Sequence, residues 1–526
     1  MSLNPYVGPW TKKEAGHLLR RTMFGATNQQ ILDAVNNGLP ATVASLLQVV
    51  SIPPPLAFDP GETIVAQGTT WVNSVYPAQV LASNNAESAR YKSIAAWMMQ
   101  NINQESLSIT EKMLFFWQNH FGVSAVTEAR AMYHFLELLR QNCLGNFKQL
   151  VKDVTIDPSM LIFLNGASNT VYSPNENFAR ELLELFTIGK GDQIGAGDYS
   201  NYTEMDVAAG AKILTGFQVS GIRSSTMTAT ISTFTPILHD TTSKQLSYHF
   251  NNLLVSNNGG SEYSDYIDVI FQHSEVAEFI CTKLYRYFVN YDLTQDVLTT
   301  VIPGMAQTLI ANNYNIQAVL QDLFLSEHFY YGTLRGTIIR NPLDMLFTVL
   351  NSTSTTPTFD LVGNSNVYLT IYYAAENMGL SYAQPPSVAG WSAYYQVPAF
   401  SKLWINSTTI KYRFDVVSGI LFAGLNIAGN NFKLNTMGFL NGLSIPSSAP
   451  DVIDDICDVF FPVTVSLVEK TILKNILTNN LPDFEWTIQY NDYLADPTNP
   501  IVLDPVRQRL ELVLNRVFKM PQFQMI

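Results

Sequence analysis

Hydrophobic residues recur along most of this chain at the spacing of amphipathic helices. In the first such segment, residues 11–47, the apolar positions that fit a helical face are Leu18, Leu19, Ile31, Leu32 and Val35. Apolar residues three or four positions apart lie on one side of a helix, which can then pack on a core. The same pattern predicts further helices at about residues 86–103, 109–121, 125–142, 147–155, 173–187, 203–215, 263–271, 275–289, 297–311, 316–326 and 504–518.

The pattern changes after Gly216. Residues 217–250 are rich in Ser and Thr, and Met227, Ala229, Ile231 and Thr233 stand at every second position. A period of two is typical of a strand, so we predict a small β-hairpin insertion that ends at His239-Asp240. The predicted fold is therefore mainly α, a multi-helix globular body with a small β-hairpin insertion near the middle.

Polar connections divide the chain. Residues 351–366 and 428–450 are rich in Gly, Ser, Asn and Pro, which is typical of loops between elements. We expect a helical core domain at residues 1–350, carrying the insertion at about 217–250, and a C-terminal extension at residues 351–526 packed on it. A single domain is the alternative.

The helix predicted at residues 173–187 carries an unusual density of charge. Ser173, Pro174 and Glu176 form a capping-box pattern, and Glu176, Arg180 and Glu184 recur every four residues on one face. In one interpretation Arg180 is a structural node that holds two carboxylates beside the core. In the other, Glu181 or Glu184 is a general acid or base in a cleft, and Arg180 grips an anionic substrate. A second capping box, Thr203 to Asp206, opens the helix at residues 203–215.

His239 and Asp240, with Lys244 four residues on, are catalytic candidates together with Glu181 and Glu184. Imidazole transfers protons near neutral pH and also binds metals. We expect His239 and Asp240 to face the two glutamates across a solvent-accessible pocket. The alternative is a surface turn in which Asp240 caps Thr242 or Ser243.

His17 and His120 each lie on a predicted helix beside large apolar residues. Each fits a core histidine, or a metal site shared with His239 and the carboxylates. A divalent metal ion is the candidate cofactor, although no HExxH, CxxC or EF-hand spacing accompanies these histidines. The three cysteines, Cys143, Cys281 and Cys457, are far apart and are expected to be buried thiols.

Aromatic residues gather after a Pro-Pro turn, and Trp391, Tyr394 and Trp404 are candidates for substrate binding. Flat rings with polar edges can stack on a glycan or enter an interface with a partner protein. The alternative is a loop pinned onto the helical core.

The composition narrows the classes of function. Charged residues make up 14% of the 526 residues, and the formal net charge is −13. No Lys/Arg cluster is present, so we expect no nucleic-acid partner. The longest apolar stretch, residues 416–428, is too short to span a bilayer, and the N-terminus lacks a standard secretory signal. We expect a soluble protein; its Asn/Ser/Thr/Tyr-rich surface also suits an extracytoplasmic location, and the sequence leaves the compartment open.

Several segments resemble, in order, the motifs of a large bacterial family, domain of unknown function 1800. They are His17–Gly25, Trp117–Phe121, Asp157–Leu161, Leu164–Gly166, Pro174–Phe186 with Gly189, Tyr202–Asp206, Leu214–Phe217, His239–Asp240 with Lys244, Lys283–Phe288, Pro385–Trp391, Trp404–Asn406 and Arg413. The resemblance implies a bacterial protein of a family without an assigned activity. Its genes are often neighbours of a second family, domain of unknown function 1501, which resembles sulfatases and alkaline phosphatases. That neighbourhood implies a partner or a shared pathway.

Two hypotheses about function follow. The first is a hydrolase-like or glycan-processing enzyme with a His/carboxylate cleft. The second is a non-catalytic assembly or binding protein that acts with a partner. The sequence has no GxSxG elbow, no P-loop and no GxGxxG after a strand, so serine-hydrolase and nucleotide-binding functions lack their expected motifs.

Overall fold

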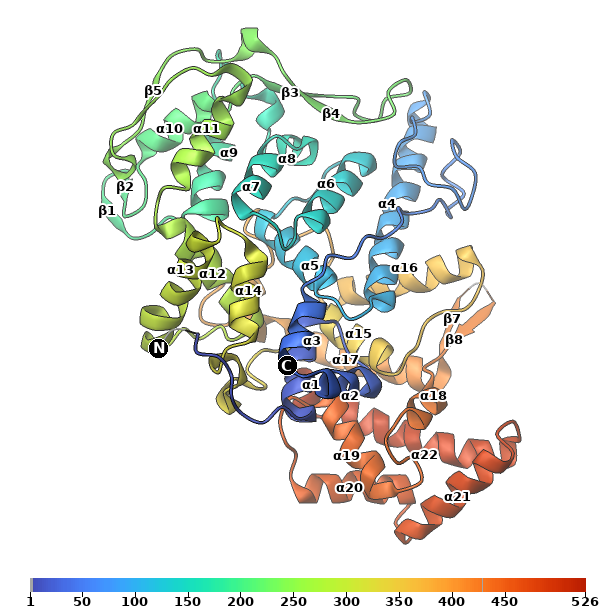
Figure 1. Ribbon diagram of the computed structural model, residues 1–526. Coiled ribbons are helices and arrows are strands. Elements are labelled where there is room, and N and C mark those ends of the chain that lie inside the picture. The colour runs from blue at the N-terminus through green and yellow to red at the C-terminus, as the bar shows by residue number, and fades with distance from the viewer. Residues whose placement is uncertain (1–2, 428) are drawn as a thin grey trace.

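The computed structural model describes residues 3–427 and 429–526, which form 22 α-helices and four small two-stranded antiparallel sheets (Figure 1). Helices contain 58% of the residues, so the predicted mainly α fold is confirmed. Residues 1 and 2 of the N-terminal segment and residue 428, where the second polar connection begins, lie outside the described residues.

The described N-terminal part of the chain forms eight α-helices, and one of them, α5, is buried. They are α1 (Lys12–Thr22), α2 (Asn28–Asn37), α3 (Leu39–Leu46), α4 (Val80–Gln104), α5 (Thr110–Phe121), α6 (Ala129–Gln141), α7 (Phe147–Thr155) and α8 (Pro158–Phe163). Every residue of α5 except Asn119 is buried. A helix shielded on all faces belongs to the interior of a fold, and α5 packs there against α6.

The middle of the chain adds a second helical layer and three hairpins. Its helices are α9 (Glu176–Glu181), the π-helical turn η2 (Leu182–Thr187), α10 (Glu204–Ile213), α11 (Glu262–Ile270), α12 (Glu275–Phe288), the π-helical turn η6 (Val297–Val301), α13 (Ile302–Ala311) and α14 (Ile316–Phe324). The paired strands are β1 (Gln193–Gly195) with β2 (Asp198–Tyr199), β3 (Phe217–Ser220) with β4 (Ile231–Phe234), and β5 (Lys244–Gln245) with β6 (Leu254–Val255).

The C-terminal part continues with helices that pack on the earlier ones. They are α15 (Pro342–Ser352), α16 (Leu361–Asn377), α17 (Ser407–Ser418), the π-helical turn η11 (Gly419–Ala423), α18 (Thr436–Asn441), α19 (Ala449–Phe460), α20 (Leu467–Thr478), α21 (Asp483–Ala495) and α22 (Pro500–Phe518). The last hairpin pairs β7 (Leu425–Ile427) with β8 (Asn430–Phe432). Helix α16 lies against α4, and α19 lies against α1. The domain boundary near residue 350 stays a prediction.

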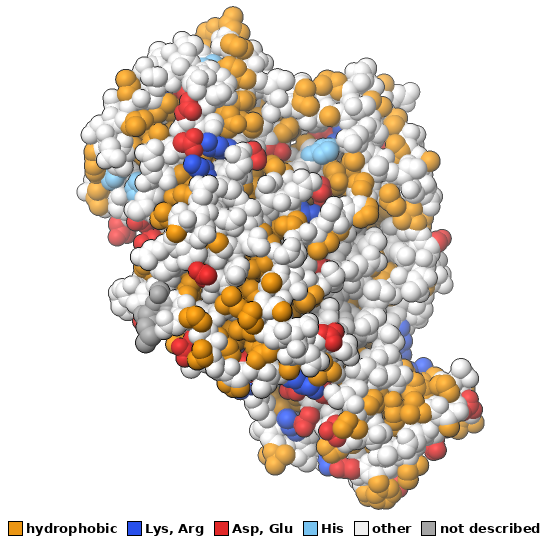
Figure 2. Space-filling view, viewed as in Figure 1, with side chains coloured by type: hydrophobic (Ala, Val, Ile, Leu, Met, Phe, Trp, Pro, Cys, Tyr) orange, Lys and Arg blue, Asp and Glu red, His pale blue; other side chains and the backbone are white. Residues whose placement is uncertain are grey.

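The interior is one large cluster of buried hydrophobic side chains that extends from Ala15 to Phe523. On the outside, charged side chains are sparse, and Figure 2 shows them scattered among polar and apolar groups on the face in view. The three cysteines are buried free thiols, as expected, and burial raises the pKa of each.

The two predicted capping boxes have different outcomes. The box from Thr203 to Asp206 is confirmed, with the Asp206 carboxylate accepting from the Thr203 backbone N–H at 2.8 Å. The box at Ser173 is wrong, because the Ser173 N–H closes a tight turn onto the Thr170 carbonyl at 3.0 Å. Helix α9 begins later, at Glu176, where the Asn175 side chain supplies the cap.

The predicted β-hairpin insertion is confirmed as the β3–β4 pair, with Phe217 opposite Phe234 and Ser220 opposite Ile231. Met227 and Ala229 lie in the connecting loop and not in a strand. The hairpin extends across the top of the molecule in Figure 1, from α10 toward α4.

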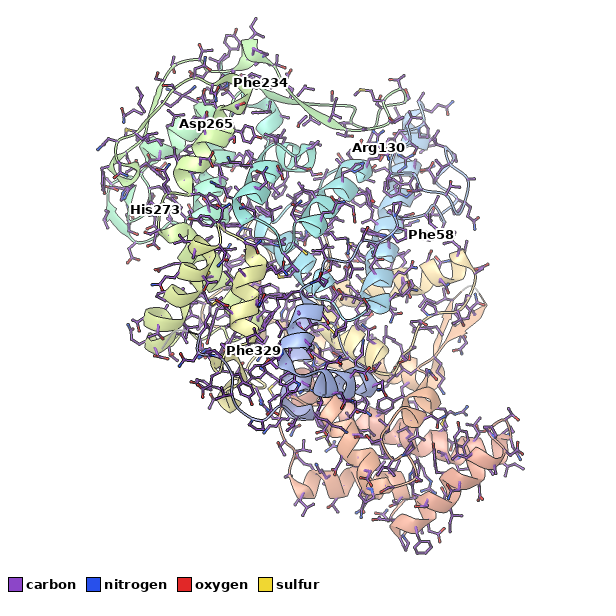
Figure 3. The ribbon with its side chains drawn as sticks, viewed as in Figure 1. Phe58, Arg130, Phe234, Asp265, His273 and Phe329 are labelled. Atoms are coloured by element: carbon purple, nitrogen blue, oxygen red, sulfur yellow. The ribbon has the colours of Figure 1, made fainter. Side chains whose placement is uncertain are left out.

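A buried ion pair holds the loop of this hairpin on the helical body. Arg130 on α6, labelled in Figure 3, binds both carboxylate oxygens of Glu128 at 2.9 and 3.1 Å. The same guanidinium donates to the carbonyls of Gly221 and Met227 at 2.7 Å each, and to that of Ser74 at 3.0 Å. Neither side chain of the pair is exposed. Arg130 therefore joins α6, the hairpin loop and the segment before α4.

We predict that Arg130→Met destabilises the fold strongly. The substitution leaves the Glu128 carboxylate buried without its cation, and loss of one partner of a buried pair costs about 3–5 kcal/mol. The measurement is the free energy of unfolding from urea denaturation. The matched control is Lys411→Met, because the pair of Lys411 with Asp415 is 77% and 59% exposed. An exposed pair contributes about 1 kcal/mol or less, so equal losses in both variants would contradict the prediction.

Candidate functional site

His239, Asp240 and Lys244 come together in the fold, around a carboxylate that the sequence did not single out. Glu262, at the start of α11, lies 3.0 Å from the Nε2 atom of His239 and 2.5 Å from the Nζ atom of Lys244. The Nδ1 atom of His239 lies 2.9 Å from the Thr215 carbonyl oxygen. These residues form a closed network inside the protein.

This network is not the solvent-accessible pocket that we expected. His239 is 4% exposed and Lys244 is 2% exposed. The Asp240 carboxylate accepts from the Thr242 N–H at 2.8 Å, as the alternative of a capped turn requires. Charged groups that saturate one another in the interior have the character of a structural node.

Glu181 and Glu184 lie elsewhere. Glu184 accepts from the Tyr202 hydroxyl at 2.8 Å, and Lys190 lies 3.4 Å from it. Burial and the neighbouring Glu184 charge raise the pKa of Glu181. Among the described residues, no hydrogen bond or ion pair joins either glutamate to His239 or Asp240.

Arg180 pairs with one of its two predicted partners, Glu176, and more closely with Glu204, which was not predicted. Its two terminal nitrogens bind Glu204, at the start of α10, at 2.7 Å each, and one also lies 3.3 Å from Glu176. Glu184 is not a partner, because α9 gives way to the π-helical turn η2, which breaks the four-residue repeat. The Arg180 side chain is 30% exposed, so Arg180 is half-buried and is not a node inside the core.

The aromatic segment is pinned onto α5. The Trp391 ring stacks on Phe115 with centroids 5.2 Å apart, and its backbone N–H donates to the Asn119 side chain at 2.9 Å. Trp404 is buried, with its ring 6.0 Å from that of Tyr394. The two tryptophans therefore anchor the loop, and Tyr394 lies at its inner edge.

A small cavity of about 50 Å³ opens beside this loop. It is lined by Phe116, Asn119, His120, Lys283, Arg286, Tyr287, Ala389, Tyr394 and Tyr395. The lining contains two basic side chains and an imidazole, and no carboxylate. The cavity lies where three of the segments that carry the family resemblance meet: those that begin at Trp117, Lys283 and Pro385.

His120 and Lys283 are in direct contact at this cavity. The Lys283 Nζ atom lies 3.2 Å from His120 Nδ1 and donates to the Leu185 carbonyl at 2.8 Å. His120 Nε2 lies 3.1 Å from the Phe186 carbonyl oxygen. Since Nε2 donates to that carbonyl, Nδ1 carries the lone pair and accepts from Lys283.

The carbonyls of Leu185 and Phe186 come from the π-helical turn η2, the continuation of the charged helix α9. In such a turn the backbone departs from the regular α-helical ladder, and π-helical turns occur often at functional sites. The charged helix thus contributes to this cavity through its backbone, while its glutamates lie elsewhere.

Burial shifts both titratable groups of this pair toward their neutral forms. Burial, with the nearby Arg286 charge, lowers the pKa of Lys283 to about 7. Burial and the Lys283 charge hold the pKa of His120 well below its usual value. Near neutral pH a substantial fraction of Lys283 is therefore an uncharged amine, which is the form that accepts protons.

Arg286 makes no hydrogen bond or ion pair with any described residue, and its buried Nε atom has no partner. Its guanidinium lies over the Phe400 ring, 5.2 Å from the centroid. A guanidinium presents five donors in a planar fork that fits carboxylate, phosphate and sulfate groups. Arg286 is thus available to an anionic ligand in the cavity.

The metal candidates do not share a site. His17 is a core histidine, with Nε2 3.0 Å from the Phe329 carbonyl oxygen (Phe329 is labelled in Figure 3). His120 and His239 belong to the two separate networks above. Within the described ranges, no three His, Cys, Asp or Glu side chains are placed to hold one metal ion. In the same ranges, no helix is long and apolar enough to cross a bilayer.

Lys283 and Arg286 entered the sequence analysis only within the family segment Lys283–Phe288, without a role of their own, and Glu262 was not singled out. Lys283 and Arg286 stand one helical turn apart on α12, among Leu284, Tyr285 and Phe288, and that pairing of cations on an apolar helix was the available signal. Glu262 gave no signal of its own, because its partners lie 18 and 23 residues away.

We predict that Arg180→Met has a small effect on stability. The Arg180–Glu204 pair is exposed by 30% and 40%, and such pairs contribute about 1 kcal/mol or less. The measurement is the melting temperature and the free energy of unfolding. A loss of unfolding free energy as large as that of Arg130→Met would contradict this assignment and support Arg180 as a structural node.

Comparison with known proteins identifies a family for this chain but no individual relative. No curated protein and no solved structure matches this chain. The family described as protein of unknown function (DUF1800) matches residues 17–525, nearly the whole sequence. The chain therefore belongs to the DUF1800 family, as the resemblance of its motifs implied.

Proposed function

We propose that this protein is a hydrolase-like enzyme that acts on a substrate with an anionic group, with Lys283 as the general base and Arg286 as the anion clamp. The observation that carries the proposal is the unpartnered Arg286 guanidinium beside the Lys283–His120 pair, in a cavity without a carboxylate. An acidic sugar, such as a uronic acid or a sulfated sugar, also fits the sequence-based expectation of glycan processing.

The geometry of Lys283 supports the role of base. In the amine form, one N–H donates to Leu185 and the other to His120 Nδ1, so the nitrogen lone pair is left for the cavity. A water molecule held there transfers a proton to Nζ, and its oxygen attacks the acyl, phosphoryl or sulfuryl centre. The ammonium then returns the proton to the leaving group. His120 positions the amine through Nδ1.

The first test is hydrolysis of 4-nitrophenyl phosphate, sulfate and acetate by the purified protein and by Lys283→Met. General-base catalysis contributes about 10²–10⁴-fold, so Lys283→Met is expected to lower kcat by that factor. Arg286→Met is expected to raise KM for the two anionic substrates and to leave the neutral acetate ester less affected. The matched control is Lys13→Met, because Lys13 is exposed. The catalytic role of Lys283 would be overturned if the protein did not turn over these substrates, or if Lys283→Met turned them over as fast as the unmodified protein.

The pH dependence gives an independent prediction. The amine form of Lys283 is populated above its pKa of about 7, so kcat is expected to rise with pH through about 7 and then level off. An anionic ligand on Arg286 favours the ammonium and moves this midpoint upward. A rate that falls as pH rises from 6 to 8 would show that the protonated form is required.

Chemical labelling can detect the amine without any substrate. Cyanate carbamylates uncharged amines, and ordinary lysines are almost fully protonated near pH 7, with pKa values of about 10.4. We predict that peptide mass mapping after brief treatment at pH 7 finds Lys283 modified ahead of exposed lysines such as Lys13, and that sulfate slows the reaction. Uniform labelling of both lysines would contradict the lowered pKa.

The second candidate function is binding of a partner protein, for which the resemblance suggests the domain of unknown function 1501 family. It is favoured by apolar side chains on the C-terminal helices, where Leu467, Val468, Phe484 and Ile501 are 79%, 70%, 59% and 81% exposed. Figure 2 shows hydrophobic groups gathered on this lower part of the molecule. Co-purification that is lost in a Leu467→Asp, Phe484→Asp double variant and kept in Lys283→Met would support this function.

A further inference from the structure

A second and larger cavity, of about 380 Å³, lies at the other end of α5. It is bordered by α4, the loop at residues 50–58, the start of α5 and Leu361 on α16. Figure 3 labels Phe58, which lies in that loop beside α4. A cavity of this volume falls within the range of small-molecule sites, about 300–1,000 Å³.

The walls of this cavity are mostly apolar. Pro53, Pro54, Pro55 and Phe58 form one side, and Trp97 on α4 faces them. The Trp97 indole N–H already donates to the Pro53 carbonyl at 2.8 Å, so its polar edge is satisfied. An apolar stem of a ligand can therefore enter without loss of hydrogen bonds from the walls.

The polar end of the cavity holds two carboxyl groups, those of Glu105 and Glu111. Glu105 follows the last residue of α4, and its Oε1 atom accepts from the Glu111 backbone N–H at 2.9 Å. Glu111 is 2% exposed and is ion-paired with Arg140 on α6. Arg140 also binds Glu137 at 3.0 Å and lies over the Trp97 ring. The cluster thus contains three carboxyl groups and one guanidinium.

Glu105 is the carboxyl group without a cation. The Arg140 guanidinium donates to Glu111 and Glu137, and no ion pair of Glu105 exists among the described residues. Burial, and next the Glu111 charge, raise the pKa of Glu105 well above its usual value. In the free protein this group therefore tends to hold a proton that a nearby cation would displace.

We infer that this cavity binds an organic cation, an ammonium or guanidinium group on an apolar stem, with Glu105 as its counter-ion. The apolar walls hold the stem, and the excess of carboxyl groups over guanidinium at the polar end favours a positive charge. The side-chain oxygens of three amides at the rim, Gln100, Asn101 and Gln104, can accept from the remaining N–H groups.

This inference does not depend on the proposed function. Glu111 and His120 are nine residues apart on α5, so the two cavities are separated by about 13 Å along the helix at about 1.5 Å per residue. Their charges are opposite, cationic at Arg286 and acidic at Glu105. A negative result at one cavity therefore does not contradict the proposal for the other.

The test compares benzylammonium with benzyl alcohol, which has nearly the same shape and no charge. Isothermal titration of the full chain at pH 7 is expected to give at least tenfold tighter binding of benzylammonium. Glu105→Gln keeps the acceptor for the Glu111 N–H and is expected to lose that preference. The matched control is Glu327→Gln, which makes the same change of charge at an exposed position.

Proton release provides a readout in the unmodified protein. Titration in two buffers of different ionisation enthalpy is expected to show release of a proton, up to one per benzylammonium bound, and affinity that increases with pH. The titratable groups around Glu105 are Glu111, Glu137, Arg140, Cys143 and Tyr382, and only Arg140 among them is cationic.

Three results would overturn the inference. They are equal affinity for the ammonium and the alcohol, no binding of benzylammonium at millimolar concentration, and an equal loss of affinity in Glu327→Gln and Glu105→Gln. Lys283→Met is expected to bind benzylammonium as the unmodified protein does. That result separates this cavity from the Lys283 site.

Discussion

The burial of α5, at every residue but Asn119, is the constraint on which the rest of the structure depends. This helix carries charged side chains, and burying a polar group in the interior without a partner costs about 2–7 kcal/mol. Lys112 is ion-paired with Asp344 on α15 and Glu111 with Arg140 on α6, while His120 is hydrogen-bonded to the carbonyl of Phe186. These partners fix where α15, α6 and the π-helical turn η2 lie.

The same helix gives its two ends opposite electrostatic character. Helix dipoles favour negative groups at the N-terminus and positive groups at the C-terminus. The carboxyl groups of Glu105 and Glu111 lie at the N-terminal end of α5. The cations Lys283 and Arg286 lie at its C-terminal end, beside Asn119 and His120. One buried helix thus supports an acidic cavity and a basic cavity in a protein of net charge −13.

Buried charges in this protein fall into two kinds. Arg130 and Glu262 have carboxylate, carbonyl, amine or imidazole partners, and neither residue lines the two cavities described above. Arg286 and Glu105 lack a partner of opposite charge and border cavities. The paired charges stabilise the fold, and the charges without such a partner can bind a ligand. Burial alone does not distinguish the two kinds of charge. The presence or absence of a partner of opposite charge distinguishes them.

The sequence by itself determined the local features: the mainly α fold, the Thr203 capping box, the β3–β4 hairpin and the buried thiols. These depend on residues within a few positions of one another, through helical and strand periodicity and through side chains that cap nearby backbone.

The tertiary structure alone decided the partners of the charged groups. His239 meets Glu262 23 residues away, Arg180 meets Glu204 24 residues away, and Lys283 meets His120 across 163 residues. Helical periodicity identifies which face a side chain occupies, but not which distant element packs against that face. Which element packs there depends on the whole buried core, because the packing decides which charged and polar groups come within reach of one another.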